Sequence, residues 1–171
     1  DDFQALVLLS EFLGDRESSV LKTLFKQEQY MNMVDDVNTS IEFNRDFSTL
    51  QISAELPLHA CVERVVELIA GAVKDMSNNP VPFNELQSTL IARATQDIYL
   101  QENLHYYGMM KSGYLAAGGY ALLRNYRDGL MKATPQDIQR VAEKYFSARI
   151  PVIALMSPPV AKEKDTGAEQ S

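Results

Sequence analysis

The stretch VNTSIEFNRDFSTLQISAEL, residues 37–56, is where the hydrophobic pattern of the chain changes from a helical period to a period of two. Apolar and polar residues alternate over 37–43 and again over 50–56, and the polar pair Arg45-Asp46 separates the two runs. Two alternating runs joined by a polar turn indicate an antiparallel β-hairpin with one apolar and one polar face.

Helical periodicity dominates the chain on both sides of this hairpin. Glycine, proline and capping residues mark where the predicted helices begin and end. The predicted helices cover residues 3–13, ended by Gly14; a short segment capped by Ser18 or Ser19; residues 58–76; a long segment from about 84, with Leu86, Leu90, Ala94 and Ile98 facing inward; residues 103–116, ended by Gly118-Gly119; residues 120–132; and a segment opened by Thr134-Pro135-Gln136-Asp137.

A last apolar run, residues 152–156, predicts a buried strand. The order of elements predicts an α+β fold in which helices pack on one face of an antiparallel sheet. Three strands make a thin sheet, so we expect a longer polypeptide to supply further strands from before Asp1. We expect one domain over residues 1–158 and a disordered polar tail over 159–171.

Composition excludes several classes of protein. The 171 residues include 46% apolar and 23% charged residues, which is the balance of a globular fold. The net charge of −7 disfavours a nucleic-acid surface, and no apolar run approaches the ~20 residues that span a bilayer. Because Cys61 is the only cysteine, an internal disulfide and an all-thiolate zinc site are both excluded.

Candidate catalytic groups are few, because the chain has no nucleophile elbow, phosphate-binding loop or dinucleotide motif. His59 and Glu63 share one helical face, but Cys61 points away from them and the whole face is polar, so we interpret it as solvated. Glu102 and His105 have the E-x-x-H spacing of di-iron bundles. A bundle needs a second copy of that motif, and we interpret the single copy as chance.

Two sets of side chains leave alternatives open. The tyrosines of the second half can pack helices together or form an aromatic wall against a ligand. The polar face of the hairpin can meet bulk solvent or line an internal water-filled compartment. The tyrosines are Tyr99, Tyr106, Tyr107, Tyr114, Tyr120 and Tyr126, and the polar face carries Asn38, Ser40, Glu42, Gln51, Ser53 and Glu55.

Several segments, taken in order, resemble the pitrilysin/insulinase family of zinc metallopeptidases, the inverzincins. Leu13-Gly14 followed by residues 19–25 is similar to the family's "iLGg…S-x-L…x-x-L-R" segment. The hairpin follows where that family has it. Residues 84–86 match its "x-E-L" helix start, and residues 134–146 are similar to its "vTpedvqavAkkyl" helix.

The resemblance implies homologous α+β halves, often arranged as a clamshell around a proteolytic chamber. In that family the N-terminal half holds the zinc and catalyses hydrolysis through H-x-x-E-H. This motif does not occur here. The chain therefore resembles the non-catalytic C-terminal half, with no cofactor of its own, and zinc is expected in a catalytic half. The expected partners are that half, in the same chain or as a separate subunit, and a peptide substrate.

The resemblance also implies a departure at the substrate clamp. Many active members have an Arg after "x-x-L" and a Tyr seven residues later, and the matching positions are Phe25 and Asn32. Tyr30 is the alternative if the loop shifts. The candidate substrate contacts are Phe25, Tyr30, Asn32, Asn38, Ser40, Gln51 and Ser53.

Three functions follow as hypotheses. The first is the inactive chamber wall of a zinc metallopeptidase, which by resemblance to exported bacterial members would be periplasmic. The second is a structural or regulatory subunit of the same fold without peptidase activity. The third is a free-standing helical binding module, with the resemblance an accident.

Overall fold

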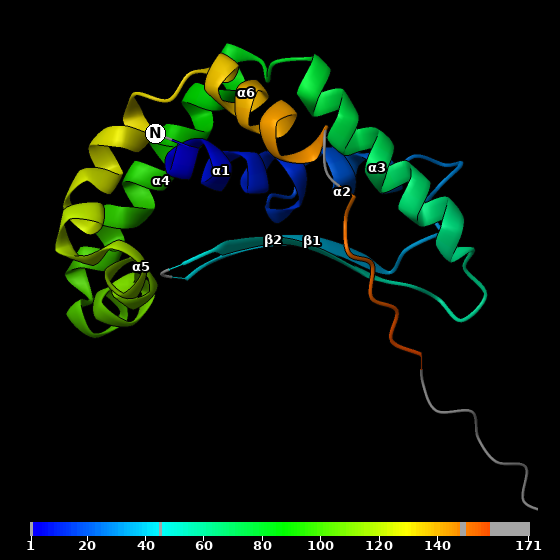
Figure 1. Ribbon diagram of the computed structural model, residues 1–171, viewed down its shortest axis with the longest axis horizontal. Coiled ribbons are helices and arrows are strands. Elements are labelled where there is room, and N and C mark those ends of the chain that lie inside the picture. Colours follow the sequence, from blue (N-terminus) through cyan, green and yellow to red (C-terminus); the bar gives the residue numbers. More distant parts are fainter. Residues whose placement is uncertain (1, 45, 148–149, 158–171) are drawn as a thin grey trace, which may run out of the picture.

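In the computed structural model, residues 2–44, 46–147 and 150–157 are described. The described chain forms a curved layer of helices over a β-hairpin (Figure 1). The elements in chain order are α1 (Asp2–Ser10), the π-helical turn η1 (Glu11–Asp15), α2 (Val20–Phe25), β1 (Asp36–Phe43), β2 (Ser48–Glu55), α3 (Val62–Asn78), α4 (Phe83–Glu102), α5 (Leu104–Met131) and α6 (Pro135–Phe146).

The predicted hairpin is confirmed. β1 and β2 pair antiparallel in one register, from Asp36 opposite Glu55 to Phe43 opposite Ser48. The helices lie on one side of the hairpin, and the other side is open (Figure 1). The apolar positions of both strands face the helices, so Val37 and Thr39 are buried while their sequence neighbours are exposed. The predicted α+β class, with helices on one face of an antiparallel sheet, is therefore confirmed.

The junction of η1 and β1 is unusually close. A Cβ atom on Gly14 would lie 2.6 Å from Thr39 Cγ2 and 3.1 Å from the Thr39 backbone nitrogen. The Thr39 hydroxyl donates a 2.6 Å hydrogen bond to the carbonyl of Ser10, the last residue of α1. We predicted that Gly14 ends the first helix, and this is wrong. Gly14 lies inside the π-helical turn, where its missing side chain lets the strand approach.

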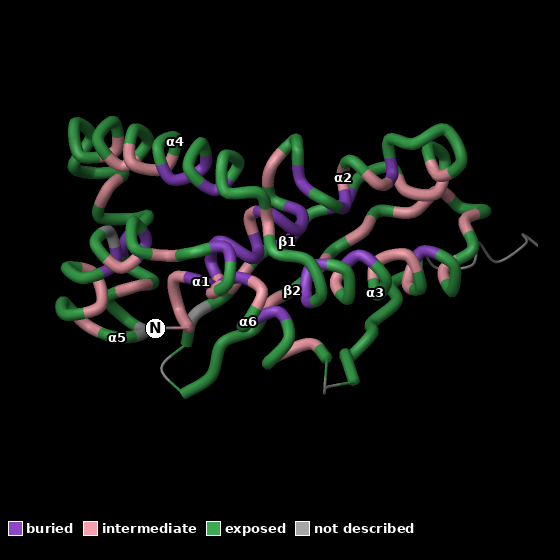
Figure 2. Tube along the Cα trace, turned by 90° about the horizontal axis from the view of Figure 1, so that it is seen from above, coloured by how far each residue is buried: buried purple, intermediate pink, exposed green. Residues whose placement is uncertain are grey.

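The core centres on α1, which packs against α6 and, through η1, against β1. Its residues Leu8 and Leu9 are fully buried, as are Ile138 and Val141 on α6. The predicted capping box opens α6. The Asp137 amide donates to the Thr134 hydroxyl, and the Thr134 amide donates to the Asp137 carboxylate. Figure 2 shows the buried segments gathered along these central elements.

The structure corrects the predicted start of α3 and the predicted inward face at the end of α4. α3 begins at Val62, not at residue 58, and Leu58 is 83% exposed because the chain there is still a loop. Ile98 was expected to face inward on α4 but is 51% exposed, since this end of the helix extends beyond the core. The predicted break between two helices at Gly118-Gly119 is confirmed, because α5 consists of two helical parts that meet at a sharp kink at Gly119, where φ is +67°.

The predicted buried strand over residues 152–156 is wrong. This stretch has no regular structure, and Ile150, Val152 and Met156 are 95%, 98% and 96% exposed. A strand needs a neighbour, and the described sheet contains β1 and β2 alone. The apolar pattern of the stretch is therefore present without a partner to bury it.

None of the helices in the described residues is both long and apolar enough to cross a membrane. The tail that we predicted to be disordered, residues 159–171, lies outside the described residues.

Candidate functional site

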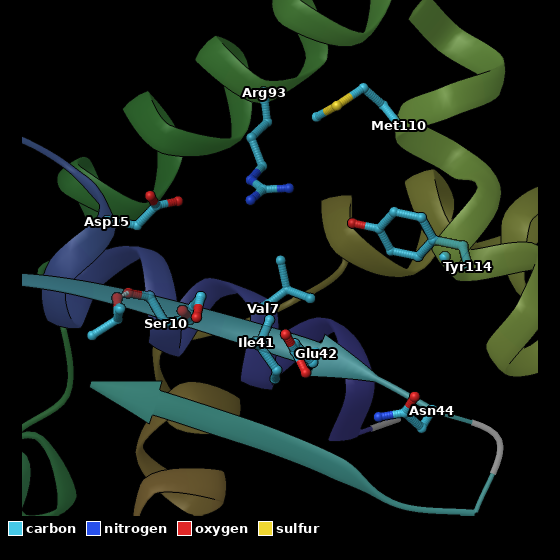
Figure 3. Close-up of a pocket in the computed structure, with 12 residues that line it drawn as sticks. Val7, Ser10, Asp15, Ile41, Glu42, Asn44, Arg93, Met110 and Tyr114 are labelled. Carbon is cyan, nitrogen blue, oxygen red and sulfur yellow. Dashed lines mark hydrogen bonds between the residues drawn. The ribbon is translucent and has the colours of Figure 1, made fainter. Parts of the chain in front are cut away.

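A cavity of about 530 Å³ lies between the hairpin and the α4–α5 pair. We call it the β1 cavity. Its floor is β1, its sides come from α1 and η1, and α4 and α5 close it from above (Figure 3). Its size falls within the range of sites that take small molecules or peptide side chains.

The β1 cavity follows the outer edge of the strand. Thr39, Ser40, Ile41 and Glu42 all line it, although successive strand residues point to opposite faces. Four consecutive residues can line one cavity only if the cavity borders the edge of their backbone. In the described part of the chain this edge has no paired strand, because β2 occupies the other side. Backbone donors and acceptors of β1 therefore face the cavity.

Arg93 on α4 reaches into the upper wall of the β1 cavity (Figure 3). Its Nε donates to Glu11 Oε2 at 2.7 Å, and one terminal nitrogen donates to the Tyr126 hydroxyl at 2.7 Å. Burial lowers the pKa of Arg93, but Tyr126 and Glu11 raise it by more, so the net shift is upward. Burial raises the pKa of the Tyr126 phenol. The guanidinium is therefore a fixed cation tying η1, α4 and α5 together.

A second, smaller cavity of about 250 Å³ lies between α4 and α5 and shares four lining residues with the first, Asp15, Arg93, Met110 and Tyr114. Lys111 is one of the residues that line this second cavity. Its ammonium is 2.7 Å from Asp97 Oδ1 and lies 5.1 to 5.7 Å from the ring centroids of Tyr107, Tyr114 and Tyr126. These three tyrosines and Lys111 all belong to α5, so the rings pack the two parts of α5 around a cation of the chain itself, and Asp97 joins that cation to α4.

The remaining tyrosines of the predicted aromatic set lie elsewhere. Tyr99, Tyr106 and Tyr120 are exposed, at 64%, 58% and 71%. The set thus divides into an inner group that packs around Lys111 and an outer group on the surface of α4 and α5. The helix-packing interpretation holds for the inner group.

The predicted substrate contacts do not lie together in the structure. Phe25 is buried in α2, while Tyr30 and Asn32 lie in the loop that follows, half-buried and exposed. Ser40 lines the β1 cavity. The other three, Asn38, Gln51 and Ser53, are exposed on the open side of the hairpin, where Gln51 donates to Ser53 at 3.1 Å.

The groups weighed as metal ligands stay apart. Across residues 2–44, 46–147 and 150–157 no three His, Cys, Asp or Glu side chains come together closely enough to hold a metal ion. Cys61 contacts Glu63 at 3.5 Å, and both residues are exposed. His105 stacks edge-on against Tyr106, with ring centroids 6.2 Å apart. The donor set that a zinc ion needs is not assembled in the described chain.

Sequence reasoning missed the charged side chains on the inner stripe of α4. Leu86, Leu90, Arg93 and Asp97 recur every three or four residues and so share one face of the helix. A signal was present, because a charged residue on an apolar stripe must find a partner when it is buried. The partners, Glu11 and Lys111, come from other helices and could not be identified from periodicity.

Comparison with known proteins identifies the fold. The sequence matches no family model and no curated protein. Three solved structures align at 21% identity, TM-score 0.72 and 85% coverage of this chain. They are a protease from Helicobacter pylori, a proposed zinc protease from Bordetella pertussis Tohama I, and the inactive peptidase domain of a proposed zinc protease from Bordetella parapertussis.

The chain has the fold of these protease domains, two of which come from proposed zinc proteases, so the predicted likeness is confirmed at the level of the fold. It spans 34% of the Helicobacter chain and 78% of each Bordetella chain. At 21% identity the likeness extends to the architecture alone.

Proposed function

We propose that this chain is a non-catalytic half of a zinc-dependent metallopeptidase and forms part of the wall of a chamber that encloses a peptide. The observation that carries the proposal is the fold, which is similar to that of an inactive peptidase domain. The resemblance of the sequence to the pitrilysin/insulinase family supports the further proposal that this half is the C-terminal half of a clamshell.

The arrangement of the hairpin is suited to a wall. One face packs against helices and the other carries exposed polar side chains, among them Asn38, Gln51 and Ser53. A surface of serine and amide groups can hydrogen bond an enclosed peptide backbone without a strong preference for its side chains. The β1 cavity opens beside this surface and adds an unpaired strand edge.

Zinc belongs, in this proposal, to a separate catalytic half. The residues described here do not fit a zinc site, since His59 and His105 lie in different parts of the chain and neither joins other donors. In the catalytic half the metal would activate water for attack on the peptide bond. This chain would contribute enclosure and positioning.

We further propose that strands from the remainder of a longer polypeptide complete the sheet. The exposed apolar run over residues 150–156 supports this, because burying a side chain such as Ile or Val contributes about 1.5–3 kcal/mol. The free edge of β2 would offer the pairing positions. In the completed sheet the run would become the strand that its sequence predicts.

A complementation experiment tests the proposed function. The chain and a catalytic half carrying H-x-x-E-H are purified separately, and cleavage of a fluorogenic peptide is measured alone and after mixing. We expect no cleavage by this chain, weak cleavage by the catalytic half, and restored chelator-sensitive cleavage by the mixture. Equal activity of the catalytic half with and without this chain would contradict the proposal.

A further inference from the structure

Arg93 has hydrogen-bond donors that the described chain does not use. A guanidinium group carries five N–H donors, which point outward in one plane. Arg93 Nε donates to Glu11 and Nη1 donates to the Tyr126 hydroxyl, each at 2.7 Å. The second terminal nitrogen, Nη2, donates to no residue in the part of the chain that the structure describes. Because the side chain is 25% exposed, these remaining donors can meet a ligand.

The cavity in front of Arg93 has the outer edge of β1 on its opposite side. In Figure 3 the guanidinium points from α4 toward β1, and β2 lies beyond β1. Because β1 pairs with β2 along one edge, the backbone groups on its other edge have no strand partner among the described residues. A free strand edge and a set of unused donors therefore face each other across the β1 cavity.

The charges around the β1 cavity favour an uncharged ligand. Arg93 repels an ammonium or guanidinium group, because its own guanidinium points into the same space. Asp15 and Glu42 also line the cavity, and they repel a carboxylate or a phosphate. A neutral oxygen acceptor, such as a peptide carbonyl, meets neither repulsion and accepts a hydrogen bond from a guanidinium.

An extended peptide carries such acceptors on both of its edges, because successive residues of a strand direct their backbone groups to alternate sides. A peptide that pairs with β1 along one edge turns the carbonyl groups of its other edge away from β1 and toward α4. In the described chain no further strand lies there to bond these carbonyl groups. Arg93 of α4 supplies donors at this position.

We propose that the β1 cavity binds a segment of an extended peptide by strand addition to β1, with Arg93 donating to a main-chain carbonyl on the outer edge of that segment. Recognition is of the peptide backbone. Val7, Ile41 and Met110 offer apolar contacts to the side chains of the segment. The inference rests on the proposed function and assigns Arg93 as a residue that binds the enclosed peptide.

Peptide binding by the 171-residue chain tests this assignment. Labelled decapeptides are compared by fluorescence anisotropy: an uncharged peptide of threonine and valine, the same peptide with N-methylated central amides, and two versions with a central lysine or glutamate. N-methylation removes the N–H donors that strand pairing needs and keeps the carbonyl groups. We expect the uncharged peptide to bind at least as tightly as the charged ones, and N-methylation to weaken its binding about tenfold.

Variants of the chain test the role of the guanidinium. Arg93→Met should weaken binding of the uncharged peptide about tenfold, because it removes a charged donor. Tyr126→Phe breaks one internal hydrogen bond of Arg93 but keeps its donors, so it should weaken binding far less. Arg64→Met removes an exposed guanidinium outside the cavity and should leave the affinity unchanged. Circular dichroism checks that each variant is folded.

Hydrogen exchange on the unsubstituted chain tests the strand edge without any variant. The outward amides among residues 39–42 should exchange more slowly when the uncharged peptide is bound, because pairing with the peptide protects them. The N-methylated peptide should give no such protection.

Five results would overturn the inference: no binding of the uncharged peptide at millimolar concentration, equal affinity for its N-methylated form, tightest binding of a charged peptide, equal losses in Arg93→Met and Tyr126→Phe, or unchanged exchange of residues 39–42. Loss of binding when the zinc-free catalytic half is added would also overturn it, because a strand of that half would then occupy the edge. The chamber-wall proposal is tested separately, by peptide cleavage in the mixture of the two halves.

Discussion

Two helix pairs in this domain are held together by different forces. α1 and α6 meet through fully buried aliphatic side chains, Leu8 and Leu9 against Ile138 and Val141. α4 and α5 meet around charges, with Lys111 of α5 paired to Asp97 of α4, and with Arg93 of α4 bonded to Tyr126 of α5 as well as to Glu11 of η1. Many of their apolar residues are exposed, and Figure 2 shows α4 and α5 as largely exposed or half-buried. The first pair provides stability, and the second positions polar groups around the β1 cavity.

The difference has a physical cause. Burial of closely packed aliphatic side chains stabilises the fold, and a gap in their packing costs stability. In a buried ion pair, the cost of removing both charges from water roughly offsets their mutual attraction. A charged interface therefore adds little to stability, but it fixes the direction in which its groups point. This suits the wall of a binding site.

Cavity formation in the first pair should have the largest effect. Leu8→Ala removes a side chain with no exposed surface and should lower the free energy of unfolding by about 3 kcal/mol. Ile98→Ala on α4 should lower it by less than about 1 kcal/mol, because Ile98 is half-exposed. Urea denaturation measures both. Similar losses in the two variants would show that the helix pairs are equally packed.

A methyl group at Gly14 should be the next most damaging change. Gly14→Ala places its Cβ 2.6 Å from the Thr39 side chain and close to backbone, so we expect a loss of about 2 kcal/mol. Gly108→Ala on α5 meets no atom within 4 Å and should stabilise the chain by about 0.5–1 kcal/mol. Thermal unfolding measures the change in stability of each variant, and we expect the two changes to have opposite signs. A neutral Gly14→Ala would mean that η1 and β1 are not in close contact.

Removing the cation of the second pair should have a moderate effect. Arg93→Met keeps the length of the side chain but leaves the largely buried Glu11 carboxylate without its partner, at a cost of about 1–2 kcal/mol. Arg64→Met breaks an exposed pair with Glu67 and should change stability by less than about 0.5 kcal/mol. If both variants unfold at the same urea concentration, the Arg93 network does not hold α4 and α5 in place.

The smallest expected effect depends on pH. The hydrogen bond from Lys144, followed by that from Arg140, lowers the pKa of Asp2 well below its usual range. A lowered pKa in the folded state stabilises the fold above the ordinary Asp pKa near 4, and this contribution is lost as the pH falls through the folded-state value. Asp2→Asn should therefore cost about 1 kcal/mol at pH 7.

The same substitution should cost progressively less below about pH 4. Urea titrations at pH 7 and at successively lower pH values measure the difference in unfolding free energy between the unsubstituted chain and the Asp2→Asn variant. A difference that stays constant down to about pH 2 would show that the interactions of the Asp2 carboxylate do not contribute to stability.

The sequence predicted the elements whose signals are local. Alternation in residues 37–56 identified the hairpin, and Thr134 with Asp137 identified the start of α6. Both signals depend on neighbouring residues alone. Gly14 was assigned the wrong role, because its contact with Thr39 joins residues 25 positions apart.

The candidate site was less predictable. Of the proposed substrate contacts, Ser40 lies at the β1 cavity, while Arg93, Asp15 and Glu42 were not recognised as a group. They come from α4, η1 and β1, and tertiary packing alone brings them together. The apolar run over 152–156 shows the opposite case, in which a pattern typical of a buried strand forms no strand and remains exposed, because burial requires a partner.

Zinc titration of the purified 171-residue chain, by isothermal calorimetry in a buffer that does not bind the metal, tests most directly whether this domain is a wall without a catalytic centre. We predict no saturable binding at micromolar zinc. One equivalent of zinc bound at micromolar affinity or tighter, and removed by a chelator, would contradict the account.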